Sequence, residues 1–499
     1  MAARTWRDLF AIDLRSLAAL RMAVAALVLV DLLQRVPLIG AHYTDGGIVP
    51  RALALQHWLD PAPSLSLHQL NGSYGFATGL FALAGLFAVM LLLGFATRIA
   101  TVASWVLLLS LQHRNYYVLD GGDMLLRLLL FWMMFLPCGA RWSLDAQRRR
   151  SNEPGRAILS IASMALLLQF VMVYVVAGVA KNGAAWHAEG TAIGHAIGQG
   201  YWNTALGDWL FRYPQFSRVL SPLVVWFEIL GPLVMFVPAS TPLIRTVMVV
   251  LFALFQIGLG TTIELNLFPW ANFAASLAFV PSEFWDRSLR GKARTSDEIT
   301  RMLGPAQAIV AIALLYAVAA NLSFLGLFKM PSIIGKAGNA VGMVQRWNLY
   351  APRPEDRDFN FEVLARLNDG TVVRLVGPRG DDDWPSIRNL RLPDGLVLAV
   401  TNASDDERRA IQTVHDRHRN RYYMHKMHYP QRPVDLRPQH YLDWIAREWN
   451  ADRLESRRVE KLWLFGLTRR IMGGPPEAPT RVVIGEWWAR SRGKTTDQM

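Results

Sequence analysis

Long apolar runs constrain this chain more than any other feature of its sequence. An α-helix needs about 18 to 24 mainly apolar residues to cross a bilayer. Nine apolar windows reach or approach that length, near positions 17–39, 74–96, 99–112, 120–138, 157–180, 218–238, 243–260, 264–280 and 305–327. The window at 99–112 is short, and the break between 243–260 and 264–280 is poorly defined. The sequence predicts an all-α polytopic membrane bundle of about eight or nine transmembrane helices.

Composition supports this class and argues against nucleic-acid binding. Hydrophobic residues make up 52% of the 499 positions and charged residues only 18%, with a formal net charge of +13. The arginines lie in short loops between apolar runs and in a C-terminal region that also carries many acids, so their excess indicates membrane topology and anionic lipid. Cys138 is the only cysteine, which excludes an intramolecular disulfide and a cysteine metal site.

The positions of the basic residues predict the orientation. Basic clusters precede the first span, follow the fourth and follow the eighth, and they comprise Arg4, Arg7, Arg15, Arg141, Arg148, Arg149, Arg150, Arg156, Arg287, Arg290, Lys292, Arg294 and Arg301. A cytoplasmic N-terminus, which we expect to be an uncleaved signal anchor, puts all three clusters inside. Two long connections, 41–72 and the aromatic-rich 182–217, then lie outside.

The composition changes after Phe328. We assign 1–328 to the transmembrane domain and 329–499 to an extracytoplasmic α+β domain. Alternating residues at 359–367 and 371–376, joined at Asp369-Gly370, predict a β-hairpin. The sequence from Pro393 to Gly395 predicts another turn before a strand, the region beyond Asp405 favours helices, and 481–491 favours a last strand.

Several charged residues fall within or at the ends of apolar runs, where an unpaired charge costs several kcal/mol. Asp123 and Arg127 are four residues apart on one helical face, which predicts a self-contained structural pair. Glu228 has no local cation, so it is either protonated or paired with another helix. Lys181 ends the apolar stretch that begins at Leu166. It is either an anchor that reaches the headgroups along its aliphatic stem or a buried amine.

The sequence offers no convincing metal site, phosphate loop or Ser-His-Asp signature. Four C-terminal histidines have helix-like spacing, but cations interleave them and disfavour a divalent metal. This strip comprises His415, Arg417, His418, Arg419, Arg421, His425, Lys426 and His428. We interpret it as a basic surface that faces the membrane or a peptide.

Three stretches carry a resemblance to a known family: YTDGGIVPR (43–51), RNYYVLDGGDMLLRLLLFWMMFLPCGARWSLD (114–145), and YVVAGVAKNGAAWHAEGTAI (174–193) followed by FEILGPLVMF (227–236). The chain resembles the HTTM membrane family, whose best-known member is the vitamin K-dependent gamma-glutamyl carboxylase. The segment QRWNLYAPRPEDRDFNF (345–361) resembles the start of the extracytoplasmic domain of bacterial members.

The resemblance implies that Lys181 is the base that deprotonates reduced vitamin K or another quinol, with Gly178 before it and Trp186 after it. In the carboxylase, oxygenation of the quinol drives the carboxylation of a glutamate side chain. Tyr116 and Gln256 stand where the carboxylase has histidines, and Ala180 replaces a lysine. Candidates for the pocket or for substrate contacts are Asn115, Tyr116, Asp123, Gly178, Trp186, Glu228 and Gln256.

Desolvation decides whether Lys181 can act as a base. A lysine at its ordinary pKa near 10.4 is protonated at neutral pH, whereas burial can lower the pKa of a lysine by about 3 to 5 units. One hypothesis is therefore a carboxylase-like membrane enzyme that oxidises a quinol, with a peptide or protein substrate at the outer domain. The alternative is a non-enzymatic membrane binding protein of the same family. A transporter ranks third, because internal sequence symmetry is missing.

Overall fold

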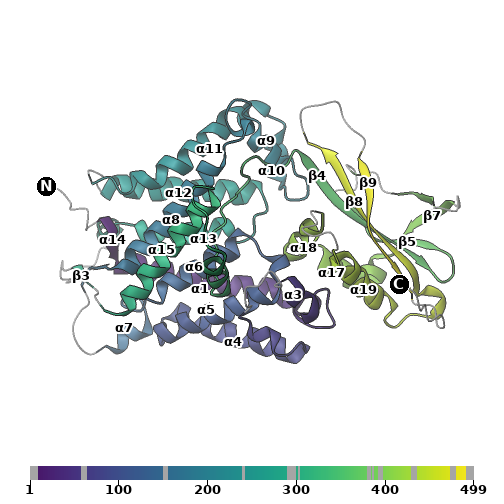
Figure 1. Cartoon of the computed structure of the whole chain (residues 1–499), viewed down its shortest axis with the longest axis horizontal. Helices are drawn as coiled ribbons and strands as arrows, with labels where there is room; N and C mark the ends of the chain where they lie inside the picture. The colour runs from purple at the N-terminus through teal and green to yellow at the C-terminus, as the bar shows by residue number, and fades with distance from the viewer. Residues whose placement is uncertain are drawn as a thin grey trace.

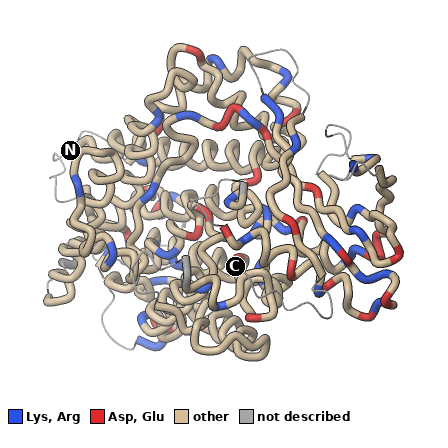
Figure 2. Tube along the Cα trace, turned by 45° about the vertical axis from the view of Figure 1, so that its right-hand side comes forward, with Lys and Arg blue, Asp and Glu red and all other residues tan. Residues whose placement is uncertain are grey.

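The computed structural model describes residues 9–57, 65–149, 155–238, 242–288, 299–301, 304–378, 384, 387–391, 397–428, 435–471 and 479–489. Helices dominate the first two thirds of the chain, and a six-stranded sheet with three helices forms the C-terminal region (Figure 1). Charged residues are sparse along the long helices and frequent in the β-rich region (Figure 2).

Six helices of the described residues are long and apolar enough to cross a membrane: α1 with its continuation (Leu14–Tyr43), α4 (Tyr74–Leu93), α8 (Ile161–Ala180), α11 (Pro214–Val234), α12 (Pro242–Thr262) and α15 (Ala306–Phe324). The remaining three windows also form helices, α5 (Thr97–Arg114), α6 (Gly121–Met133) and α13 (Phe268–Ser276). Most side chains of α6 and α13 are buried among the longer helices. The predicted count of eight or nine spans is therefore not confirmed, although each window is helical.

Local sequence signals define where the long helices begin and end. Ser160 caps α8 by accepting from the backbone N–H of Ser163, whose hydroxyl accepts from Ser160 N–H in return. Asp120 and Asp123 form the same reciprocal arrangement at the start of α6. Gly94 ends α4 in a left-handed conformation that favours glycine. These caps satisfy backbone groups that hydrocarbon could not.

Shorter helices continue the first span, connect the spans or follow the last one. They are α2 (Ile39–Tyr43), α3 (Arg51–His57), α7 (Leu144–Arg148), α9 (Ala192–Ile197), α10 (Ala205–Phe211), α14 (Ser282–Ser288) and α16 (Ser332–Ala340). The predicted outer connections 41–72 and 182–217 both contact the C-terminal region. Arg447 donates to Gly46 O at 2.9 Å, and Gly183 N donates to Pro352 O at 3.1 Å. Both connections therefore lie at the end of the bundle that carries the β-rich region.

A small three-stranded sheet gathers the basic segments at the other end. Strand β1 (Ile12–Asp13) pairs antiparallel with β2 (Ala157–Leu159), which pairs parallel with β3 (Ile299–Arg301). Asp286 of α14 binds Arg15 at 2.8 Å and also pairs with Arg156. Strand β3 and helix α14 lie on the side away from the six-stranded sheet (Figure 1). The three basic clusters thus share one end as predicted; Arg4, Arg7, Arg150, Arg290, Lys292 and Arg294 lie outside the described residues.

The C-terminal region contains β4 (Arg357–Leu367), β5 (Val372–Val376), β6 (Asn389–Arg391), β7 (Val397–Asn402), α17 (Asp405–His415), α18 (His418–His428), α19 (Arg437–Asn450), β8 (Val459–Arg470) and β9 (Thr480–Trp488). The sheet order is β6-β7-β5-β4-β8-β9. The predicted hairpin is confirmed, because β4 pairs antiparallel with β5 across Gly370 at a φ of 84°. The predicted turn at 393–395 lies outside the described residues.

The connections near Ile48 and Trp202 and the β-rich region share one hydrophobic core. Ile48, Tyr117 and Trp202 from the membrane half pack in the same buried cluster as Phe359 and Tyr441. Helix α18 lies between the bundle and the sheet (Figure 1). The C-terminal region is therefore held against the bundle by packing as well as by charge.

The position of Cys138 makes the orientation testable. It is the only cysteine and is buried, so Asp406→Cys in α17 or Gln147→Cys in α7 provides a single accessible thiol. A cytoplasmic N-terminus predicts that a membrane-impermeant maleimide labels Asp406→Cys in sealed right-side-out vesicles, and Gln147→Cys only after permeabilisation. The unmodified chain is the control and should stay unlabelled. The reverse pattern would contradict the predicted topology.

Candidate functional site: a membrane cavity at the Lys181–Glu228 ion pair

A cavity of about 630 Å³ lies between α8, α11 and α12, beside α9 and α10. Its walls are mainly leucine, isoleucine, valine and phenylalanine, and among the described residues that line it only Lys181 and Glu228 are charged. Other polar side chains in the lining are Tyr174, Trp186, Gln256, Thr261, Thr262, Tyr350 and Tyr422. An apolar cavity with a few converging polar groups is the usual form of a small-molecule site.

Lys181 is a buried, paired amine. It follows the last turn of α8 and donates its backbone N–H to Gly178 O at 3.1 Å. Its Nζ lies 2.6 Å from Glu228 Oε2 on α11, and only 2% of the residue is exposed. The Trp186 ring centroid is 5.1 Å from Nζ, within cation–π range. Lys181 therefore does not reach the surface as an anchor would, and Glu228 has a partner on another helix.

Gly178 allows this pair to form. A Cβ at Gly178 would lie 2.7 Å from Ile229 Cγ1 and 3.2 Å from Glu228 Cβ. The two helices can approach this closely because the glycine has no side chain, a common device where helices pack in membranes. Gly178 is thus a packing residue behind the cavity wall.

Gln256 places an unpaired polar atom at the cavity. Its Nε2 donates to the Tyr174 hydroxyl oxygen, while its Oε1 is buried and has no hydrogen-bond partner among the described residues. Turning the amide would exchange the two atoms and still leave one of them unpaired. Because an unpaired buried polar atom costs free energy, Gln256 provides a contact point for a ligand.

Residues far along the chain close the cavity. The Trp186 indole donates to Tyr350 O at 3.1 Å, and both residues line the cavity together with Leu349 and with Tyr422 of α18. Sequence reasoning missed Tyr174, Leu349, Tyr350 and Tyr422 as site residues. A tyrosine inside the apolar stretch of α8 was a usable signal for Tyr174, whereas the contributions of Leu349, Tyr350 and Tyr422 depend on how the C-terminal region docks on the bundle.

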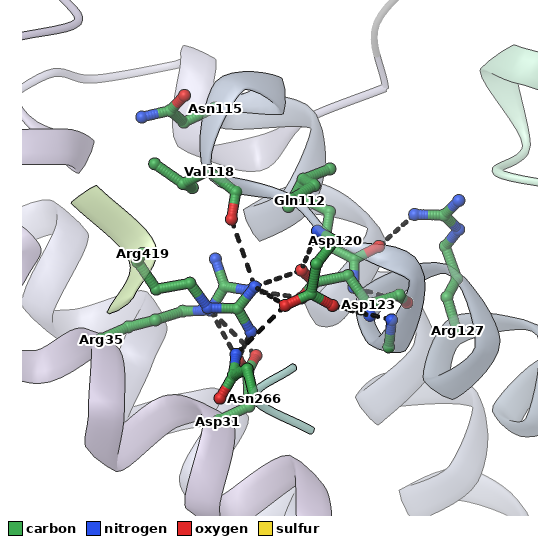
Figure 3. A network of polar contacts seen from close by, with 12 residues as sticks. Asp31, Arg35, Gln112, Asn115, Val118, Asp120, Asp123, Arg127, Asn266 and Arg419 are labelled. Atoms are coloured by element: carbon green, nitrogen blue, oxygen red, sulfur yellow. Dashed lines mark hydrogen bonds and ion pairs between the residues drawn. The ribbon is translucent and has the colours of Figure 1, made fainter. Parts of the chain in front are cut away.

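A second polar cluster joins the bundle to α18 (Figure 3). Arg35 Nε lies 2.9 Å from both carboxylate oxygens of Asp31, and the Arg35 guanidinium also pairs with Asp123. Arg419 of α18 pairs with Asp31 and Asp123 and lies 3.2 Å from Asp120. Burial and Arg35 lower the pKa of Arg419, but the carboxylates outweigh them and hold it above its ordinary value.

The predicted Asp123–Arg127 pair is wrong. Arg127 instead donates to Gly342 O at 2.7 Å and to the Gln112 side chain, while Asp123 pairs with Arg35 and Arg419 (Figure 3). A spacing of four residues permits an ion pair within a helix, but in the folded chain the guanidinium groups of Arg35 and Arg419 pair with Asp123 instead.

Asn115, Tyr116 and Asp123 do not line the cavity. Asn115 Oδ1 accepts from Tyr117 N at 3.1 Å and its Nδ2 donates to His42 O at 3.3 Å, so it holds the turn before α6. Tyr116 O accepts from Lys426 Nζ at 2.9 Å. The structure thus brings together Lys181, Trp186, Glu228 and Gln256, with Gly178 behind them, and separates the other three candidates from this site.

The basic strip of α18 mostly faces the bundle. Arg419, Arg421 and Lys426 contact this chain's own membrane half, and Arg421 pairs with Glu264. Burial lowers the pKa of Lys426 to about 7 and that of His418 to about 3. The interpretation of Arg419, Arg421 and Lys426 as a surface that faces the membrane or a peptide is therefore wrong. Arg417, in contrast, is exposed.

No three His, Cys, Asp or Glu side chains within the described ranges are arranged to hold a metal ion. The long apolar helices define the class of this chain as an integral, multi-pass membrane protein.

Its family follows from comparison with known proteins. A family model described as the HTTM domain matches residues 10–285, more than half of the chain, and the chain belongs to the HTTM family. No curated protein and no solved structure matched the chain.

The close approach at Gly178 predicts a stability effect. Gly178→Ala should destabilise the protein by about 1–3 kcal/mol, because the added methyl group must displace Ile229 or Glu228. Gly79→Ala in α4 is the matched control, since a Cβ there meets no atom within 4 Å, and it should be neutral or stabilising by about 0.5–1 kcal/mol. Thermal unfolding in detergent measures both. Equal midpoints for the two variants would contradict the packing role.

The Arg419 cluster predicts a larger loss. Arg419→Met leaves Asp31 and Asp123 with Arg35 as their guanidinium partner and takes away the guanidinium group that pairs with Asp120. It should cost about 3–5 kcal/mol because a buried carboxylate loses its counter-charge. Arg409→Gln in α17 is the control: its pair with Asp406 is exposed, so its removal should cost at most about 1 kcal/mol. Denaturant titration in detergent compares the two. A loss no greater than that of the control would refute the role of the cluster.

Proposed function

We propose that this HTTM protein binds a reduced quinone in the cavity and oxidises it, with or without carboxylation of a glutamate side chain. The observation that supports this proposal is the form of the cavity, in which apolar walls surround the Lys181–Glu228 pair and the amide of Gln256, one atom of which is unpaired. A quinol is an apolar ring with two hydroxyl groups, and the walls and the polar groups match these two parts.

The bound quinol would supply the reducing electrons: with O2 it gives a quinone epoxide and water. Lys181 and Glu228 would accept the proton that leaves the quinol hydroxyl. If the two residues form an ion pair, the proton acceptor is the Glu228 carboxylate. If they are a neutral amine and a carboxylic acid, the acceptor is Lys181 Nζ. Either form accepts one proton, so the pair as a unit acts as the base.

The remaining polar groups would orient the quinol. Gln256 offers its unpaired amide atom to one ring oxygen, and Tyr174 holds the amide from the other side. Trp186 and Tyr350 limit the access of water from the outer end of the cavity. Low water content strengthens each polar contact with the ligand.

Turnover by purified protein tests the proposal. The protein is incubated in lipid nanodiscs with menaquinone-4 hydroquinone and O2, and mass spectrometry measures the epoxide. Lys181→Met should lower the rate by about 10²–10⁴-fold, the usual contribution of a positioned base. Lys329→Met, at an exposed lysine beyond α15, is the control and should leave the rate unchanged.

Two further variants separate proton transfer from structural pairing. Lys181→Arg can keep the ion pair but cannot lose its proton, so a folded yet inactive variant favours the amine as acceptor. Glu228→Gln should abolish turnover if the carboxylate is the acceptor. Turnover that survives all three substitutions removes the pair from the chemistry. Quinol binding without any epoxide in the unmodified protein would favour the alternative of a binding protein.

A further inference from the structure

The cavity reaches the lipid-facing side of the bundle. Several of its lining residues are large apolar side chains with substantial exposure, including Leu223 of α11 at 57% and Leu251 of α12 at 42%. Both helices are among the candidate membrane spans. In a bilayer these exposed positions contact hydrocarbon.

We propose that the cavity has a mouth between α11 and α12 that opens to the lipid, and that its ligand is an amphiphile with a long hydrocarbon tail taken directly from the bilayer. This inference rests on the proposed quinol site and adds where the ligand enters and which tail it carries. Leu223, Leu251 and Gly258 define the mouth.

The depth of the mouth in the membrane supports entry of the ligand from the side, out of the bilayer. Leu223 precedes Glu228 by five residues and Leu251 precedes Gln256 by five, which corresponds to about 7–8 Å along each helix. Because α11 and α12 run in opposite directions, the mouth spans the depth of the polar groups. A ligand can therefore keep its tail in hydrocarbon while its polar ring reaches Lys181, Glu228 and Gln256.

The apolar lining of the cavity also favours a lipid ligand over a water-soluble one. Among the described lining residues, charge occurs only at the Lys181–Glu228 pair, and the mouth carries leucine and glycine. A water-soluble ligand would gain no polar contact along this route and would lose its hydration in the bilayer. A tailed amphiphile already dissolved in the bilayer avoids that cost.

Gly258 provides a clean way to close the mouth. It lines the cavity, it is exposed, and a Cβ placed there meets no atom within 4 Å. A phenylalanine at this position can therefore enter the opening without displacing the backbone. Gly85 of α4 is the matched control, since it is also a glycine within a span with open space around its Cβ and it is absent from the cavity lining.

The first experiment measures equilibrium binding in nanodiscs of two reduced quinones, menadiol, which has no tail, and menaquinone-4 hydroquinone, which carries four isoprene units. Gly258→Phe should weaken binding of the tailed quinol by at least about tenfold, because losing the burial of about two methylene groups already has that effect. Menadiol binding by Gly258→Phe, and binding of both quinols by Gly85→Phe, should change little. Equal loss of both quinols in Gly258→Phe, or no loss of the tailed one, would overturn the inference.

The second experiment does not depend on quinol binding. A fatty acid that carries a diazirine close to its carboxyl group is photolysed in the same nanodiscs, and mass spectrometry maps carbene insertion. Insertion at Tyr174 or Gln256, reduced in Gly258→Phe and retained in Gly85→Phe, supports the mouth. If a water-soluble diazirine labels these residues and the fatty acid does not, the cavity opens to water and the inference fails. If neither quinol binds but the fatty acid inserts, the quinol proposal fails and the lipid mouth stands.

Discussion

Every charge that this chain removes from water must find a partner, and this constraint organises the structure. Arg419 satisfies it with acids that include Asp31, 388 residues earlier in the sequence. Its guanidinium enters the bundle from α18 and meets Asp31, Asp120 and Asp123 (Figure 3). Those acids would be strongly unfavourable in the interior without it. The C-terminal region is therefore part of the charge balance of the helical bundle and does not behave as an appended module.

Docking of α18 also completes the cavity. Arg419 and Arg421 precede Tyr422 in α18, and Tyr422 lines the cavity. The segment that leads to β4 adds Leu349 and Tyr350, with Tyr350 O bonded to the Trp186 indole. Interactions that hold the C-terminal region in place thus also determine the shape of the site around Lys181.

Helices and strands could be predicted from the sequence more reliably than the tertiary contacts between their side chains. Each apolar window is helical and the hairpin at Gly370 forms, because hydrophobic runs and turn residues act locally. The Asp123–Arg127 prediction failed because i, i+4 spacing says nothing about competing guanidinium groups from Arg35 and Arg419, which is 296 residues away. Lys181, Trp186, Glu228 and Gln256 were identifiable as polar residues at apolar helices, but only the fold shows that they share one cavity.

The pairing of Lys181 changes what burial implies for its chemistry. Desolvation of an isolated lysine favours the neutral amine, whereas a carboxylate at 2.6 Å favours the ammonium ion. Lys181 and Glu228 therefore have to be considered as one unit. Removing either side chain leaves the other as an unpaired buried group, so a substitution at one position changes the environment of both.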